Sequence, residues 1–422
     1  MGVVDDRPDT AAPVLDRLLA LVDERVAPDR APTVAAFTRE YVRRLAEEQP
    51  DADPEALFRE ALGAFGLASE RGAAPVAVRA FNPDPDEHGY QAGGAVLETN
   101  TEDLPFLVDS VSGELEGRGL GIVRVVHPII GTERDAAGRI VAVKHPREAS
   151  ATESVMHFEL DRPLAPEELA GLEDAARTAI EDVRQVVRDH TAMRQHVEDM
   201  IELARRGEGR YDEEEVTETV AFLRWLLDGN FVFLGARDYE IEDDRIHVIP
   251  GSGLGLLCDT GHSAWARPVP LESLDASLRE RIVEGDLLIV SKSNRLSPVH
   301  RRARMDYVGV RRVGPDGATR GESRMLGLFT SKAYVEPASQ TPLLHRKLQA
   351  ILAAEDLIHG SHDYKAAIAL FDSFPKDELL SAPVEDLRRG RQGARDRARG
   401  RGRRAARQRR PRPRPRARSR AP

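Results

Sequence analysis

The side chains of this chain that are best suited to bind a small anion form one basic cluster. The cluster consists of Arg295, His300, Arg301, Arg302, Arg304, Arg311 and Arg312. A guanidinium presents paired N–H donors that match the two oxygens of a carboxylate, so the cluster could bind a carboxylate effector. Nearby acids on a solvated face could also neutralise it, as happens with many charge-rich loops. The sequence leaves both interpretations open.

Patterns typical of cofactor or metal chemistry are incomplete. Residues 251–255 approach a dinucleotide loop, but Leu256 stands where Gly-x-Gly-x-x-Gly needs its last glycine. His359 and His362 are spaced like metal ligands on a helix, yet Gly360 favours a loop and no further ligand set accompanies them. We therefore predict no catalytic, cofactor-binding or metal-binding residues in this chain.

Charge divides the chain into two unequal parts. There are 61 Lys+Arg and 71 Asp+Glu, but residues 388–422 hold 17 Arg and one Asp, so the preceding part has 44 basic and 70 acidic residues. An acidic body disfavours phosphate backbones and anionic lipid, and only the tail would attract polyanions. The tail lacks large apolar residues, so we expect it to be disordered.

The composition indicates a cytoplasmic protein without a membrane partner. No stretch approaches the roughly 20 apolar residues that span a bilayer. Cys258 is the single cysteine, which excludes an internal disulfide and is consistent with a reducing compartment. Because Cys258 follows Leu256 and Leu257, we expect a buried, inert thiol.

Hydrophobic periodicity predicts the elements that would position these residues. Helical spacing dominates the beginning of the chain, and alternating apolar residues first appear near Val76. The next elements read strand, helix, strand, strand and long helix, which is a ferredoxin-like order, and two similar cycles follow. The predicted fold is α+β, with a helical leader, repeated ferredoxin-like modules and an Arg-rich tail. The predicted boundaries are 1–72, 73–208, 209–285, 286–387 and 388–422.

Several long sequence blocks prompt a comparison with a known family. They are Leu104–Val111, Val126–Pro128, Phe222–Gly235, Ser291–Arg301 and Lys365–Leu379, the last of which contains Asp372–Glu378. In this order they resemble the amino-terminal region of the large bacterial NAD-specific glutamate dehydrogenases, and the resemblance covers roughly residues 35 to 389. It implies ACT-like modules, which commonly bind amino acids between paired modules and transmit that binding to a catalytic domain.

The resemblance also implies a function and a set of contact residues. The family oxidises L-glutamate with NAD and water to 2-oxoglutarate, ammonium and NADH, and it forms homo-oligomers. We expect this chain to be the regulatory and assembly region, inactive alone because the nucleotide-binding domain lies beyond it. Candidate effector or interdomain contacts are Asp103, Arg295, His300, Arg301 and Arg304. Phe106 stands where ligand-binding ACT modules carry glycine after Asp-x-Pro, which argues against binding there.

The Arg-rich tail permits two hypotheses. Arg, Ala, Gly and Pro are what GC-rich DNA encodes in a wrong frame, so a frame change near Arg388 would give a chain without its catalytic core. Alternatively, the chain is a free-standing ACT-like amino-acid-binding protein whose genuine cationic tail binds nucleic acid. Sequencing the DNA across codons 385 to 395 would distinguish them.

Overall fold

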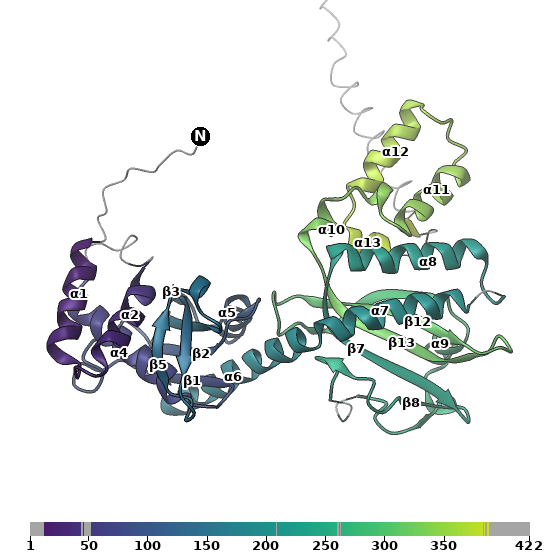
Figure 1. The fold of residues 1–422 in the computed structure, drawn as a ribbon. Helices are drawn as coiled ribbons and strands as arrows, with labels where there is room; N and C mark the ends of the chain where they lie inside the picture. The colour runs from purple at the N-terminus through teal and green to yellow at the C-terminus, as the bar shows by residue number, and fades with distance from the viewer. Residues whose placement is uncertain are drawn as a thin grey trace, which may run out of the picture.

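The computed structural model places the chain in two lobes joined by long helices (Figure 1). The residues that it describes are 12–43, 45, 52–207, 209–259, 261, 263–382, 384, 386 and 387. The Arg-rich tail, for which disorder and nucleic-acid binding were predicted, lies outside the described residues. Among the described residues, no helix is both long and apolar enough to cross a membrane.

In the described part of the leader the helices are α1 (Ala12–Arg25), α2 (Ala31–Val42) and α4 (Pro54–Glu70), at the helical spacing that the sequence predicted. The third begins where the sequence indicates, because the Asp53 side chain accepts the N–H of Glu55 at 3.1 Å and Pro54 occupies the first turn. Their apolar faces pack together and against one face of the first sheet, burying residues such as Phe37 and Phe58.

The first sheet has six strands and is flanked by two helices. Its elements are β1 (Val76–Phe81), β2 (Val96–Glu102), α5 (Leu107–Gly117), β3 (Ile122–Val126), β4 (Ile129–Arg134), β5 (Ile140–Lys144), the 3-10 turn η1 (Pro146–Glu148), β6 (Thr152–Leu160) and α6 (Pro166–Arg188). The strand order is β1-β2-β6-β4-β5, and β3 also pairs with β6. All these pairings are antiparallel.

This sheet contains the predicted ferredoxin-like unit with two additions. The predicted order is found in β2, α5, β3, β6 and α6. Strand β1 lies beside β2, in the position that the last strand of a ferredoxin-like unit would otherwise occupy. The second addition is the β4–β5 hairpin. Both β3 and β4 pair with β6, through Val126 to His157 and Ile129 to Ser154, so they form one strand interrupted at residues 127–128.

The long helix that the sequence predicts is interrupted at Asp189. Helix α6 ends at Arg188, and α7 (His190–Arg205) continues into the second lobe (Figure 1). Asp189 lies at the break, where its carboxylate accepts the N–H of Gly255 at 2.7 Å. That contact fixes the helix junction to the second sheet.

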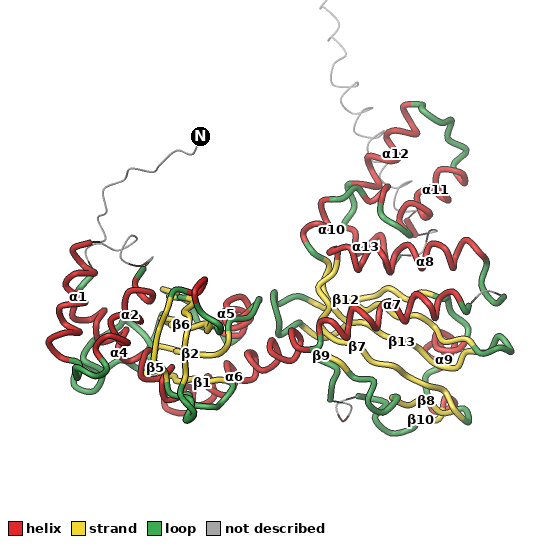
Figure 2. The backbone as a smooth tube through the Cα atoms, viewed as in Figure 1, coloured by secondary structure: helices red, strands yellow, loops and turns green. Residues whose placement is uncertain are grey.

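The second sheet is antiparallel throughout and lies beneath α7 and α8 (Figure 2). Its elements are α8 (Glu213–Trp225), the π turn η2 (Leu226–Asn230), β7 (Phe231–Glu242), β8 (Arg245–Val248), β9 (Leu254–Gly255), β10 (Val269–Pro270), η4 (Leu271–Ser273), α9 (Ala276–Val283), β11 (Leu288–Leu296), β12 (Arg304–Val313) and β13 (Thr319–Phe329). Gly229 has φ 77°, the left-handed conformation predicted for it. Residues 271–283 are divided between η4 and α9, because Asp275 caps a new helix at Ala276.

Strands from the predicted second and third modules share this one sheet. Strand β13 pairs with β7 from Phe329 opposite Phe231 to Gly321 opposite Glu240. The described residues therefore form two sheets, where the sequence suggested three modules. Local periodicity gives the strands, but it does not give the partner of each strand.

Short helices follow the second sheet in the described part of the chain. They are α10 (Ser331–Val335), α11 (Leu344–Ala354), α12 (His362–Asp372) and α13 (Lys376–Ser381), with the 3-10 turn η5 (Ala338–Gln340) between the first two. The segment 364–371 lies in α12, which the Ser361 hydroxyl caps by accepting the N–H of Tyr364. These helices cover α8 on the side away from the sheet (Figure 1).

Candidate functional site

The two lobes meet where α5 faces the loop of residues 297–303, which we call the lobe junction. Phe106 and His300 face each other there, with ring centroids 4.9 Å apart. Both have left-handed backbones, with φ of 72° and 69°. Non-glycine residues in this conformation cost on the order of 1–3 kcal/mol and are held by their surroundings. Phe106, which stands where ligand-binding ACT modules carry glycine, thus has a left-handed backbone although it carries a phenyl side chain.

Hydrogen bonds from α5 hold His300 in place. The His300 N–H donates to Ser110 Oγ at 3.0 Å, and the Ser110 hydroxyl donates to the carbonyl of Phe106 at 2.6 Å. The His300 Nδ1 lies 3.3 Å from Asp109 Oδ2. Phe106 is the N-cap residue of this helix, and no side chain caps it.

Arg302 extends the lobe junction along α5. Its Nη1 lies 3.4 Å from the carbonyl of Gly113 and 3.6 Å from the Glu114 carboxylate. A Cβ added to Gly117 would lie 1.9 Å from the same nitrogen, so glycine permits the close approach. Two residues of the basic cluster, His300 and Arg302, therefore contact the first lobe.

The other predicted contact residues do not gather at the lobe junction. Arg301 donates to the carbonyl of Phe329 at 2.8 Å, and its guanidinium lies 5.8 Å from the Tyr334 ring. Arg295 and Arg304 are exposed. The Asp103 N–H donates to the Thr152 carbonyl at 3.0 Å, which joins it to the first sheet.

The remaining members of the basic cluster are dispersed. Arg311 is almost fully buried, and its guanidinium donates to the carbonyls of Asp286 at 3.0 Å, Arg281 at 2.7 Å and Ile282. Arg312 lies 4.0 Å from Asp238. The buried thiol predicted at position 258 is wrong, because Cys258 lies in an exposed loop.

We expect Ser110→Ala to loosen the lobe junction. The His300 N–H loses its acceptor, and an unsatisfied buried donor costs about 1–3 kcal/mol, so its amide exchange should rise roughly 5- to 100-fold. Hydrogen-exchange mass spectrometry over residues 297–303 measures this. Ser112→Ala on the same helix is the matched control, and equal exchange in both variants would contradict the role of Ser110.

Two segments that carry the resemblance also contact each other in the second lobe. Lys292 Nζ lies 2.6 Å from the buried carboxylate of Asp306 and 2.9 Å from that of Asp377. The Tyr334 hydroxyl donates to Asp377 at 2.9 Å. Burial raises the pKa of Asp306 despite the lysine. Residues 372–378 therefore anchor the C-terminal helices to strand β11.

A second set of charged side chains lies between the leader and the first sheet. This buried ionic cluster consists of Glu60 on α4, Arg79 on β1, Glu98 on β2, Arg124 on β3, and His157 and Glu159 on β6. The negative charges of its three glutamates equal the positive charges of its basic side chains only when His157 is protonated. Buried charges persist only when such pairing compensates their lost hydration.

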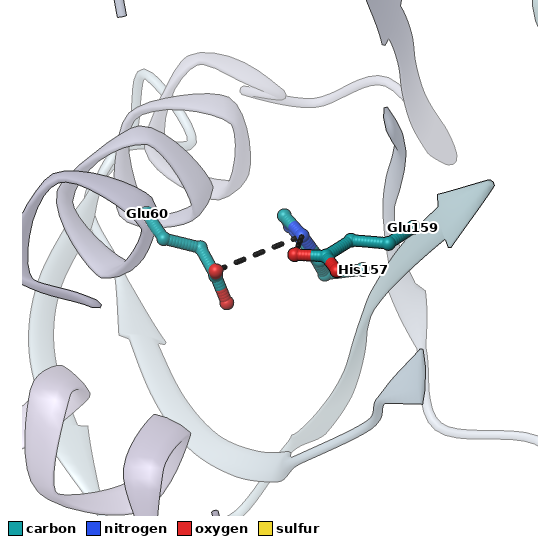
Figure 3. Close-up of side chains that lie close together, drawn as sticks. All are labelled: Glu60, His157 and Glu159. Carbon is teal, nitrogen blue, oxygen red and sulfur yellow. Dashed lines mark ion pairs between the residues drawn. The ribbon is translucent and has the colours of Figure 1, made fainter. Parts of the chain in front are cut away.

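His157 occupies the centre of the buried ionic cluster and is fully buried. Its Nδ1 lies 3.1 Å from Glu98, and its Nε2 lies 3.8 Å from Glu60 and 3.9 Å from Glu159 (Figure 3). Burial disfavours the imidazolium, but the three carboxylates outweigh it and raise the pKa of His157 to about 9. The imidazolium and the Arg124 guanidinium lower the pKa of Glu159 to about 2.

Arg124 links the two carboxylates that face His157. Its Nη2 contacts Glu60 and lies 2.5 Å from Glu159 Oε1. The Tyr41 hydroxyl donates to the other Glu60 oxygen at 2.8 Å. Burial and the neighbouring Glu60 raise the pKa of Tyr41 well above its usual range.

Glu60, His157 and Glu159 are the set of side chains in the described residues whose ligand atoms could surround a metal ion. These atoms all lie within 4.8 Å of one another. However, the Arg124 guanidinium contacts the same carboxylate oxygens, so a cation already occupies that position. The arrangement fits a buried charge network better than a metal centre.

Sequence analysis did not identify the buried ionic cluster, although β6 contains a signal. His157 and Glu159 are two residues apart, so they share one strand face, while Met156 and Phe158 point to the opposite apolar core. Polar residues on one face of a strand normally indicate that this face is exposed to solvent. The leader covers it instead, which the strand pattern alone does not show.

Comparison with known proteins relates both lobes to one family. The model of the glutamate dehydrogenase ACT1 domain matches residues 37–176, from α2 to the middle of α6. The model of glutamate dehydrogenase helical motif 1 matches residues 341–393, which include α11, α12 and α13.

Three bacterial relatives match most of the chain. The NAD-specific glutamate dehydrogenase of Halomonas elongata is 30% identical over 91% of this chain and 24% of its own length. The NAD-specific glutamate dehydrogenase of Pseudomonas aeruginosa is 31% identical over 74% of this chain and 19% of its own length. That of Mycobacterium tuberculosis is 25% identical over 77% of this chain and 19% of its own length. The chain thus spans about a quarter or less of these relatives.

Proposed function

Because the chain belongs to the family of bacterial NAD-specific glutamate dehydrogenases, we propose that its described residues form a regulatory and assembly region of such an enzyme. The proposed parent reaction is oxidation of L-glutamate by NAD and water to 2-oxoglutarate, ammonium and NADH. A cytoplasmic location, an amino-acid effector and a homo-oligomeric state belong to the same proposal.

The antiparallel pairing of the strands supports a role other than hydride transfer. Every strand pairing among the described residues is antiparallel, whereas dinucleotides bind at the carboxyl ends of parallel strands in βαβ units. The glycine-rich segment 251–255 opens no helix. Instead, Gly255 pairs with Gly235 as part of β9. These pairings support a role for the described residues other than binding NAD in a βαβ unit.

The connection between the lobes supports a regulatory role. The ferredoxin-like lobe contacts the second lobe through α6 and through the lobe junction, so a shift of α5 would move the loop of residues 297–303. Two left-handed residues in direct contact form an element with a strained geometry, and such geometry is common in switch regions. A ligand that repositions the first lobe would thereby act on the second.

We expect the chain to catalyse no reduction of NAD. Purified residues 1–422 with L-glutamate and NAD should give no more absorbance change at 340 nm than a blank without protein, and titration with NAD should show no saturable binding. The Pseudomonas aeruginosa relative, assayed in parallel, is the positive control. Glutamate-dependent NADH formation by this chain would contradict the proposed division of roles.

A further inference from the structure

The sheet side of the buried ionic cluster is balanced without the leader. Arg79 pairs with Glu98 and Arg124 pairs with Glu159, each with a guanidinium nitrogen 2.5 Å from a carboxylate oxygen. All four residues lie on strands of the first sheet, so neither pair requires the leader. His157 lies 3.1 Å from Glu98 and 3.9 Å from Glu159, but the two pairs are already neutral without its charge.

The leader inserts one further carboxylate into this arrangement. Glu60 on α4 contacts Arg124, and its Oε2 lies 3.8 Å from His157 Nε2 (Figure 3). Glu60 is only 3% exposed, so water does not hydrate its charge while the leader is docked. The arginine beside it is shared with Glu159. A proton on His157 supplies the positive charge that a third buried carboxylate requires.

The groups around His157 leave it as the one that titrates near neutral pH. They are Glu60 and Tyr41 of the leader, Arg79, Glu98, Arg124 and Glu159 of the sheet, and Tyr90 of the loop before β2. The two arginines stay protonated. Burial and the neighbouring glutamates raise the pKa of both tyrosines, which therefore stay neutral. Contacts with His157 and an arginine lower the pKa of Glu159, and also that of Glu98 despite its burial.

We infer that docking of the leader on the first sheet is coupled to the uptake of a proton by His157, so the leader is a proton-coupled cap. In the docked arrangement the imidazolium balances Glu60. When the leader moves away, Glu60 becomes hydrated and the two pairs of the sheet balance themselves. His157 then loses its proton to water. This equilibrium goes beyond the proposed function, because it involves no ligand and no step of the parent reaction.

Docking of the leader should weaken as the pH rises. With the leader docked, the pKa of His157 is raised to about 9, against about 6.5 for an unperturbed histidine. The proton therefore stabilises docking fully below pH 6.5, and this stabilisation is lost as the pH rises through 9. Between these values the docking equilibrium should change roughly tenfold per pH unit.

The other charged contacts of the leader lie at the end that is linked to the sheet. Arg71, directly after α4, lies 2.9 Å from Glu153 on β6, and the Ala68 carbonyl accepts from Arg134 at 2.9 Å. Contacts with Arg134 lower the pKa of Glu153 despite its burial, so this pair keeps its charges near neutral pH. Deprotonation of His157 therefore weakens the leader around Glu60 and leaves the linked end attached.

Hydrogen-exchange mass spectrometry of residues 1–422 from pH 6.5 to 9 tests the coupling, with each rate divided by the intrinsic rate at that pH. An undocked α4 should exchange, because isolated short helices are marginal in water. We expect the protection of α4 to fall roughly 100-fold or more over this range while α5 and α6 keep theirs. Equal losses in all three helices, or constant protection of α4, would overturn the inference. The NADH assay tests the proposed function separately.

Two variants and a matched control identify the groups responsible. Glu60→Gln removes the carboxylate that requires the proton, so the protection of α4 should no longer depend on pH. His157→Gln leaves Glu60 beside a neutral side chain, so α4 should be as weakly protected at pH 6.5 as the unmodified protein is at pH 9. Glu55→Gln on the same helix is the control, because Glu55 contacts only Arg25 and Arg59 of the leader in the described residues.

The control should keep the full pH dependence of the unmodified protein. The inference would be wrong if Glu60→Gln kept that dependence, or if α4 in His157→Gln were as protected at pH 6.5 as in the unmodified protein. Loss of the pH dependence in Glu55→Gln would also contradict it, because that change lies outside the buried ionic cluster. Should Glu60→Gln fail to fold, the comparison of His157→Gln with the unmodified protein remains decisive.

Discussion

Arg124→Met should lower the free energy of unfolding by about 3–5 kcal/mol, because it leaves the buried carboxylates of Glu60 and Glu159 without their shared partner. The Arg124 side chain is 15% exposed, that of Glu60 is 4% exposed and that of Glu159 is 20% exposed. Methionine retains most of the volume, so the loss reflects charge rather than a cavity. Urea denaturation followed by circular dichroism measures it.

The matched control for this variant lies on the same lobe. Arg118 pairs with Glu114 at 2.8 Å, but its side chain is 42% exposed. Arg118→Met should cost no more than about 0.5–1 kcal/mol, since exposed pairs contribute little. A similar loss in both variants would show that Arg124 has no special role in holding the leader to the sheet.

The fully buried His157 should make the protein less stable as the pH rises. Its pKa is raised to about 9 in the folded chain, against about 6.5 for an unperturbed histidine. The folded state therefore holds a proton that the unfolded state releases between these values, and stability is lost as the pH rises through that window. The difference corresponds to on the order of 3 kcal/mol.

His157→Gln should remove this alkaline loss. Comparing the urea midpoints of the two proteins from pH 6.5 to 9 isolates the buried ionic cluster around the histidine, because groups outside this cluster contribute equally to both. Lys347 is one such group, since burial lowers its pKa to about 8, and its contribution increases stability above that pH. Parallel pH profiles for the two proteins would show that His157 is not protonated in the folded state.

Where local rules dominate, the sequence was sufficient. The helix predicted over 54–69 is α4 (Pro54–Glu70), because its cap and its first-turn proline are adjacent in sequence. Residues 314–317, whose Gly-Pro-Asp-Gly sequence is typical of a turn, join β12 to β13, and Gly317 adopts φ 76° as its turn requires. The family resemblance was likewise readable from consecutive residues, and the comparisons confirm it.

Where contacts are remote, the sequence was not sufficient. His300 meets Ser110 across 190 residues, and the buried ionic cluster brings together residues from the leader and from strands β1, β2, β3 and β6. Four of the five predicted contact residues belong to the basic cluster, and Asp103 comes from the Asp-x-Pro turn of the resemblance. Of these, His300 contacts α5, while Arg301 turns to Phe329 and Tyr334. Charge alone does not indicate which surface lies opposite.

The sequence by itself determined the helical leader, the ferredoxin-like order of the first sheet, the family and the incomplete dinucleotide loop. Each depends on a period, a cap or a motif within a few residues. Only the tertiary structure decided that β7 pairs with β13, that the leader covers a polar strand face, and that Glu60 of the leader meets His157 there. Strand pairing and helix docking are set by the total surface buried, which no local segment encodes.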